Sequence, residues 1–195
     1  EEAQIRIDDK SKTDSLTESL RGLNYLAKKL KAQRLEDGAL TLASVEVRFH
    51  LDSETADPID LYTKELKETN SMVEEFMLLA NIEVAKKIEK EFPECAVLRR
   101  HPTPPASNFD SLINAAKTRN IKIDVNNSKS LGNSLDNATI KGDKYVQTLL
   151  RILATRCMYQ AVYFCTGTES DYRHYGLAAG IYTHFTSPIR RYADV

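Results

Sequence analysis

The chain has 195 residues, 42% hydrophobic and 28% charged, and a formal net charge of −1. This composition is typical of a globular domain and excludes a disordered chain, while the near-zero charge argues against a generally basic protein that coats nucleic acid. No apolar run is long enough to span a bilayer. The three cysteines form no Cys-x-x-Cys pair, so we expect reduced thiols in an intracellular protein.

The first third of the chain predicts a strand, a helix and a group of strands. Residues 3–8 alternate apolar and polar side chains, which is typical of a strand. From Asp14 or Ser15 onward, leucines recur at a spacing of three and four, which predicts an amphipathic helix that ends at Gly38. Short apolar runs predict strands around a polar turn at residues 52–57, namely residues 40–42, 45–51 and 58–61.

The longest helix is predicted over residues 63–92, which contain neither glycine nor proline. Apolar side chains between Met72 and Ile82 lie on nearly every side, and such a helix is buried on most faces. Glu75 falls among these apolar neighbours, so its carboxylate needs a partner. Two interpretations stay open: a structural ion pair with a core arginine, or a polar contact that lines a channel.

A connection rich in proline follows over residues 93–108 and should be irregular. Within it, Arg99, Arg100 and His101 form a basic cluster that is either a phosphate site or ordinary loop charge. Three short elements come next in chain order: a helix at residues 108–120, an extended or strand segment at residues 121–125 and a helix at residues 128–137.

A second long helix is predicted at residues 144–165, where apolar side chains cover every side except at Arg151 and Arg156. Because a buried charge needs an opposite charge, the simplest ion pair joins one of these arginines to Glu74 or Glu75 across the two helices. The elements together predict an α+β fold dominated by helices, with two long buried helices and a few short antiparallel strands.

The most informative stretch is residues 182–194, Tyr-Thr-His-Phe-Thr-Ser-Pro-Ile-Arg-Arg-Tyr-Ala-Asp. Ser187 is a good N-cap and Pro188 suits the first helical position, so we expect a helix to start here. A helix N-terminus favours anions, and Arg190 and Arg191 would add positive charge in its first turn. The stretch is therefore either a phosphate site or an ordinary capped helix with an exposed basic turn.

Other side chains of this stretch suit the same ligand. Thr186 and Ser187 place hydroxyls at the expected cap, and Asp194 lies four residues after Arg190, where it can orient that arginine. Rings also gather here and suit stacking on single-stranded bases, although rings fill cores as well. These rings belong to Tyr172, Tyr175, Tyr182, His184, Phe185 and Tyr192.

Residues 182–194 resemble a motif in the RNB catalytic domain of RNase II and RNase R type exoribonucleases. Further matches to that family occur upstream in the same order, at residues 70–81, 149–151, 160–163 and 174–177. The resemblance covers residues 1–195 as one partial RNB domain, and in detail it is most similar to the exonucleases of the eukaryotic RNA exosome.

The resemblance implies a function. Members of the family degrade RNA processively from the 3′ end, release nucleoside 5′-monophosphates and use Mg²⁺ held by aspartates. We therefore expect an exoribonuclease of RNA processing, ribosomal RNA included, and of RNA decay. Its implied partners are the 3′ end of single-stranded RNA and the core subunits of the RNA exosome, with no membrane, and its implied location is nuclear, nucleolar and cytoplasmic.

The resemblance also assigns roles to individual residues. Arg190 matches the family arginine that contacts phosphate near the scissile bond, so it is the implied catalytic residue. The implied RNA-binding residues are Thr186, Ser187, Arg191, Tyr182, His184 and Glu75, the last of which matches a glutamate of the RNA channel.

The metal half of the site is not found in this sequence. No Asp-x5-Asp-x-Asp-Asp run, the pattern of the family's metal-binding aspartates, occurs in it. Because hydrolysis with metal ions needs ligands to hold them, we expect the ligands in an upstream part and expect this piece alone to be inactive. The alternative is a non-catalytic RNA-binding or exosome-associated protein that retains only this segment.

Overall fold

The computed structural model describes residues 1–42, 47–51, 55, 58–63, 66–143 and 145–194. The described residues form six α-helices and two antiparallel two-stranded sheets, so the predicted α+β class dominated by helices is confirmed. The elements are α1 (Glu2–Asp8), α2 (Ser15–Glu36), β1 (Val47–Leu51), β2 (Pro58–Thr63), α3 (Glu68–Glu91), β3 (Val97–Arg100), α4 (Asp110–Lys117), α5 (Ser128–Asp136), α6 (Val146–Cys157) and β4 (Val162–Cys165).

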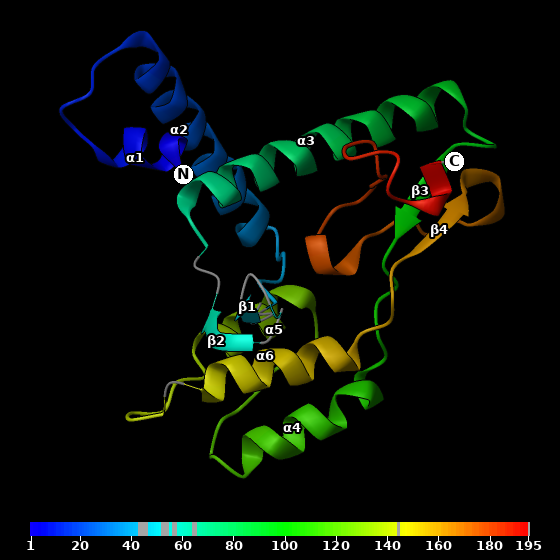
Figure 1. Cartoon of the computed structure of the whole chain (residues 1–195). Coiled ribbons are helices and arrows are strands. Elements are labelled where there is room, and N and C mark those ends of the chain that lie inside the picture. The colour runs from blue at the N-terminus through cyan, green and yellow to red at the C-terminus, as the bar shows by residue number, and fades with distance from the viewer. Residues whose placement is uncertain (43–46, 52–54, 56–57, 64–65, 144, 195) are drawn as a thin grey trace.

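Helix α3 organises the arrangement (Figure 1). Helices α1 and α2 contact α3 near its N-terminal end. Strands β3 and β4 and the C-terminal segment lie along the other half of α3, while α4, α5 and α6 form a separate layer together with the β1–β2 hairpin. The C-terminal segment therefore meets the chain's longest helix and a sheet at the same place.

Residues 3–8 belong to helix α1, so the predicted strand is wrong. Pairs spaced by four residues support the helix: Arg6 Nε lies 3.0 Å from Glu2 Oε1, and Gln4 Nε2 lies 3.0 Å from Asp8 Oδ1. The apolar–polar alternation covers only six residues, and within the described part of the chain no strand pairs with it. The local pairs therefore decide the conformation.

The prediction for α2 is confirmed at both ends. Asp14 is the N-cap, and its carboxylate accepts a hydrogen bond from Thr17 N at 3.2 Å. Gly38 follows the C-cap with φ of 102°, a left-handed conformation that glycine adopts without strain.

Only part of the predicted apolar stripe of α2 packs on α3. Ala27 of that stripe is buried beside Asn24 and Leu30 is half-buried, whereas Leu16, Leu23 and Leu26 are exposed. The periodicity thus predicted the helix correctly but not which of its faces is covered by the described residues.

The predicted hairpin is confirmed by antiparallel pairing of β1 with β2, in which Arg48 lies opposite Tyr62. Residues 40–42, predicted as a strand, join no sheet of the described chain. Of the predicted turn, residues 52–54 and 56–57 lie outside the described residues.

Helix α3 is confirmed as the longest helix of the described chain, but it is not buried on most faces. Val73 and Leu79 are exposed. The buried residues of the helix are Met72, Glu75, Asn81 and Ala85. At about 100° per residue they do not share one stripe, because different neighbours cover the two halves of the helix. Two of these four are polar, one in each half.

The helix predicted over residues 144–165 is α6, which ends at Cys157, eight residues earlier than expected. Its continuation forms β4, which pairs with β3 so that Phe164 lies opposite Leu98. The connection predicted as irregular therefore contains a strand, and residues 121–125, the other strand candidate, join no described sheet. Pairing of β3 with β4 explains both the early end of α6 and the strand within residues 93–108, because a local pattern does not reveal the partner strand.

A hydrophobic core joins α4, α5 and α6. It is dominated by aliphatic side chains with little or no exposure, among them Leu112, Ala116, Leu131, Leu135, Leu150 and Ala154. Arg151 is buried at the edge of this core, where it donates to Thr41 O and to the carboxylate of Asp136. This cluster is a hydrophobic core of the described chain.

Candidate functional site

Residues 186–191 do not start an α-helix, so the predicted helix at Ser187 is wrong. Ser187 and Ile189 have φ of 56° and 67°, in the left-handed region, and a 3-10 turn follows at Tyr192–Asp194. A right-handed helix cannot run through residues with these positive φ values. Any anion would therefore meet individual side chains and loop N–H groups here, not a helix N-terminus.

Asn81 fastens this segment to α3. The side chain is 3% exposed, and its Oδ1 accepts hydrogen bonds from Phe185 N at 3.0 Å and Thr186 N at 2.9 Å. Its Nδ2 donates to Tyr182 Oη at 2.9 Å. The sequence does carry a signal for Asn81. An amide among apolar helical neighbours needs hydrogen-bond partners, as the carboxylate of Glu75 does.

Strand β3 holds the other side of the segment. Arg99 N donates to Tyr182 O at 2.8 Å, and Thr183 Oγ1 donates to Val97 O at 2.7 Å. The segment therefore runs between β3 and the C-terminal half of α3 (Figure 1). Polar contacts on both sides fix its backbone.

A row of rings extends from the interior to this segment. Ring centroids lie 5.2 Å apart for His174 and Tyr182, and 5.6 Å apart for Tyr182 and His184, in edge-to-face contacts. His184 Nδ1 also lies 2.5 Å from Tyr163 Oη. The predicted residues Tyr182 and His184 thus lie together, with Tyr182 buried and His184 half-buried.

Two imidazoles of this row stay neutral over the physiological range. Burial lowers the pKa of His184 to about 4, with a further contribution from Arg99 and Arg191. Burial also lowers the pKa of His174 to about 3, and neither of its ring nitrogens has a hydrogen-bond partner among the described residues. His174 therefore adds no charge to the region at neutral pH.

The two adjacent arginines have different surroundings. Arg191 Nε lies 2.6 Å from Asp194 Oδ2, and its Nη2 donates to Thr186 O at 2.7 Å, so it holds the loop closed. This bond to Asp194 raises the pKa of Arg191. Arg190 is exposed and makes no ion pair with any described residue. The expected pairing of Asp194 with Arg190 is therefore wrong, and the guanidinium of Arg190 is free to bind a ligand.

Glu75 lies on the same helix as Asn81 but makes a structural ion pair. It is 3% exposed, and its carboxylate receives both Arg34 Nη2 at 2.5 Å and Arg34 Nε at 3.1 Å. The predicted partners were wrong: Arg151 is bound elsewhere and Arg156 is exposed. The ion-pair interpretation holds, and its arginine comes from α2.

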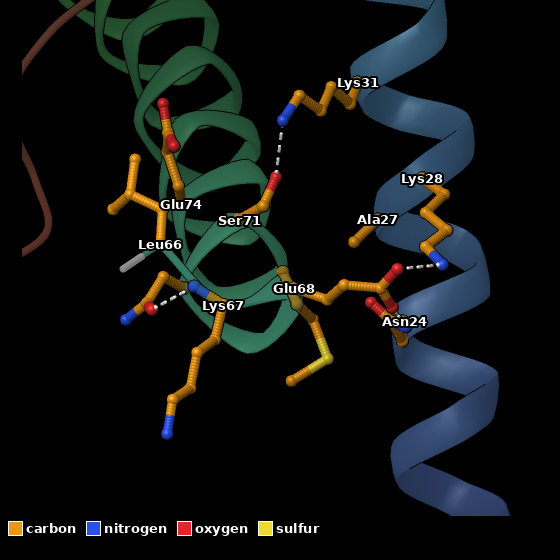
Figure 2. A pocket seen from close by; sticks show the side chains of 11 residues that line it. Asn24, Ala27, Lys28, Lys31, Leu66, Lys67, Glu68, Ser71 and Glu74 are labelled. Atoms are coloured by element: carbon orange, nitrogen blue, oxygen red, sulfur yellow. Dashed lines mark hydrogen bonds and ion pairs between the residues drawn. The ribbon is translucent and has the colours of Figure 1, made fainter. Parts of the chain in front are cut away.

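The groove between α2 and α3 has a volume of about 380 Å³ (Figure 2). Lys28 Nζ lies 2.8 Å from Glu68 Oε1, and Lys31 Nζ donates to Ser71 Oγ at 2.9 Å. These lysines bind the partner helix, so they are less available to an external phosphate than Arg190 is.

The described residues do not fit a magnesium site. Nowhere in the described ranges do three or more His, Cys, Asp or Glu side chains gather closely enough to hold a metal ion. In the same part of the chain, no helix combines the length and apolar character that crossing a bilayer requires.

Comparison with known proteins decides the family. The profile of the RNB domain matches residues 1–195. The chain belongs to the RNB domain family. This confirms the resemblance that residues 182–194 and the upstream motifs predicted.

Relatives of this RNB chain include nucleases of the exosome. It is 67% identical over 194 residues to "Exosome complex exonuclease RRP44" of Homo sapiens and 58% identical over 199 residues to "Exosome complex exonuclease dis3" of Schizosaccharomyces pombe. Both matches cover 100% of this chain and 20% of the relative. The chain thus spans about a fifth of the length of these curated relatives.

Two solved structures share its fold. RNase R of Mycoplasma genitalium, in complex with ribose methylated single-stranded RNA, matches with a TM-score of 0.83 at 27% identity, over 99% of this chain and 30% of that one. Yeast Ssd1, described as a pseudonuclease, matches with a TM-score of 0.67 at 28% identity, over 98% of this chain and 24% of that one.

Proposed function

We propose that this chain is the RNA-binding and phosphate-gripping part of a processive 3′–5′ exoribonuclease of RNA processing and decay. The observation that carries the proposal is the unpaired, exposed guanidinium of Arg190 on a loop that Asn81 and Arg191 hold in place. Relatives named exosome exonucleases and an RNase R structure with single-stranded RNA support the same reaction and substrate.

Arg190 binds the phosphate near the bond that is cleaved. Its planar guanidinium can grip a phosphate through two parallel hydrogen bonds and stabilise the charge that develops there. The half-buried residues Thr186 and Ser187 place hydroxyl donors on the same loop. Exposed rings beside the loop, those of Phe185 and Tyr192, suit stacking on bases.

The other implied site residues act by holding this loop. Arg191 reaches RNA only indirectly, because Asp194 and Thr186 O already engage it. Tyr182 and His184 supply the ring row on which the loop rests. For Glu75, direct contact with RNA has no geometric support, and we assign it the role of fixing α2 on α3.

Mg²⁺ would activate the attacking water and balance the charge on the phosphate when bound. Because the described residues do not supply a ligand set, we propose that aspartates outside this sequence hold the ions. We also propose the core subunits of the RNA exosome as partners and a nuclear, nucleolar and cytoplasmic location.

A non-catalytic RNA-binding protein is the second candidate. Yeast Ssd1, described as a pseudonuclease, shares this fold, so the fold does not by itself imply catalysis. The described residues of this chain provide no metal ligand set. If the full-length protein also lacks aspartates upstream, this second candidate is the better one.

The test uses the full-length protein and a single-stranded RNA with a labelled 5′ end. A 3′–5′ exonuclease shortens this RNA stepwise, and Arg190→Ala should lower turnover by about 100-fold, typical of losing one donor to a developing charge, with much less effect on RNA affinity. Arg190→Lys keeps the charge without the fork and should fall in between.

Two results would contradict the proposal, and they point to different alternatives. RNA binding without shortening by the wild type would support the pseudonuclease alternative. Unchanged turnover in Arg190→Ala would remove Arg190 from the reaction.

A further inference from the structure

We propose that Arg99, on β3, is a second phosphate-binding residue of the RNA path. It lies beside the C-terminal segment, since its backbone N donates to Tyr182 O at 2.8 Å. The inference rests on the proposed function, because it adds one contact to the same RNA site.

Arg99 and Arg100 are adjacent in sequence but differ in their partners. Arg100 Nη2 lies 2.7 Å from Glu169 Oε1, and its guanidinium lies over the ring of Phe164 at 5.7 Å. Arg99 lies over the ring of Tyr163 at 5.8 Å and forms no ion pair with a carboxylate of the described residues. The charge of Arg100 is thus neutralised within the fold, whereas that of Arg99 is not.

The side chain of Arg99 is only half-buried, but part of its polar head is enclosed. Its Nε, like that of Arg100, is buried and finds no hydrogen-bond acceptor within the described ranges, but only Arg99 also lacks a carboxylate partner. Leaving a buried donor unpaired is costly, and a charged group more so. An arginine stacked on a ring has a fixed orientation and presents a fork of donors without any acceptor, which suits an anion with several oxygens.

The surroundings contain an excess of positive charge. Arg99 lowers the pKa of His184 and of His174, which shows that its field reaches both imidazoles. The carboxylate that opposes this field at His184 is Asp194, and it is already bound to Arg191. In a chain with a net charge of −1, this corner is locally cationic and favours a polyanion.

RNA is the anion that fits this position. Arg99 contacts Tyr182 in the segment that continues to Arg190, and after burial both guanidinium charges contribute to the lowered pKa of His184. A strand bound at Arg190 can therefore offer a second phosphate to Arg99. Tyr163 covers one face of the Arg99 guanidinium and leaves the edge of the fork for that phosphate.

The test is the salt dependence of RNA binding by the full-length protein, measured with EDTA present so that the RNA stays intact. Each phosphate contact to a single strand contributes about 0.7 to the slope of log K against log salt. Arg99→Gln should lower this slope by about 0.7 and weaken binding about tenfold at low salt. Arg100→Gln is the matched control and should keep the wild-type slope, because Glu169 already neutralises Arg100.

A second variant guards against a folding defect. Arg99→Lys keeps the charge and should retain the wild-type slope, even where its affinity falls through loss of the fork. A wild-type slope in Arg99→Gln, or equal slopes for the Arg99→Gln and Arg100→Gln variants, would overturn the inference. The proposed function would survive that result, because it depends on the turnover of Arg190→Ala.

Discussion

The layer of α4, α5 and α6 and the C-terminal site are held together by different forces. In the helical layer, aliphatic side chains such as Leu112 and Leu131 are fully buried against one another. At the site, single polar contacts fix the backbone, above all those of Asn81, while the ring of Tyr192 is 96% exposed.

The contrast between apolar packing and polar contacts suggests that one region mainly stabilises the fold and the other mainly positions groups for a ligand. Apolar burial is strong but non-directional, so it holds a layer together without placing any one group. Hydrogen bonds contribute less net free energy, but they fix distances and leave neighbouring groups uncovered for a ligand. The proposed RNA-binding groups therefore lie outside the hydrophobic core of the described chain.

Breaking the ion pair between α2 and α3 should have the largest effect on stability. Glu75→Ala leaves Arg34 charged and partly buried without its partner, which costs about 3–5 kcal/mol. Hydrogen exchange of α2 and α3 amides in the full-length protein measures this loss. The charge swap Arg34→Glu with Glu75→Arg should restore part of it, and the pair is not the link if the swap rescues nothing.

A cavity in the helical layer should come next. Leu131→Ala removes a fully buried side chain of α5 and should cost about 3 kcal/mol through lost burial and an unfilled cavity. Leu149→Ala, on α6, is the control, because Leu149 is 57% exposed and should change stability by less than about 1 kcal/mol. Amide exchange in α6 measures both, and equal losses would contradict the proposed core.

Acid should weaken the ring row. The folded pKa of His174 is about 3, below the ordinary value of 6.5, so the unfolded chain binds the proton more tightly. Stability is therefore complete above about pH 7 and falls as the pH drops below 6.5, by about 2 kcal/mol at pH 5. His174→Phe should remove this part of the pH dependence of unfolding, while the part due to His184, whose pKa is lowered to about 4, remains. An unaltered slope in that variant would show that His174 does not contribute.

Removing the anchor of the C-terminal segment should have the smallest effect on stability. Asn81→Ala leaves two backbone N–H groups and the Tyr182 hydroxyl without their partner, at a cost of about 1–2 kcal/mol. Turnover of the full-length enzyme should fall about tenfold, because the loop of Arg190 loses its position. Asn81→Asp keeps the acceptor for both N–H groups and should retain more activity than Asn81→Ala.

Local patterns predicted the elements that local forces stabilise. Helix α2 was predicted to begin at Asp14 or Ser15 and to end at Gly38, and both ends depend on nearby residues. The lack of glycine and proline predicted α3 as the longest helix, although it begins at Glu68 and Thr63 belongs to β2. The motif at residues 182–194 also led to the correct family.

Long-range pairing could not be predicted in the same way. The β3–β4 ladder, the partner of Glu75 and the anchoring role of Asn81 all join residues at least 40 positions apart. Ser187 had every local feature of a helix cap, but no continuing turn stabilises a helix after it among the described residues. Tertiary partners therefore decide these cases, and a single sequence does not reveal them.

The most direct test of the central claim compares Leu131→Ala with Arg190→Ala in the full-length protein, with the stability and the turnover per folded molecule measured for each. We expect Leu131→Ala to lose stability and keep turnover, and Arg190→Ala to keep stability and lose about 100-fold in turnover. Parallel losses of both properties in both variants would contradict the separation of a stabilising layer from an RNA-binding site.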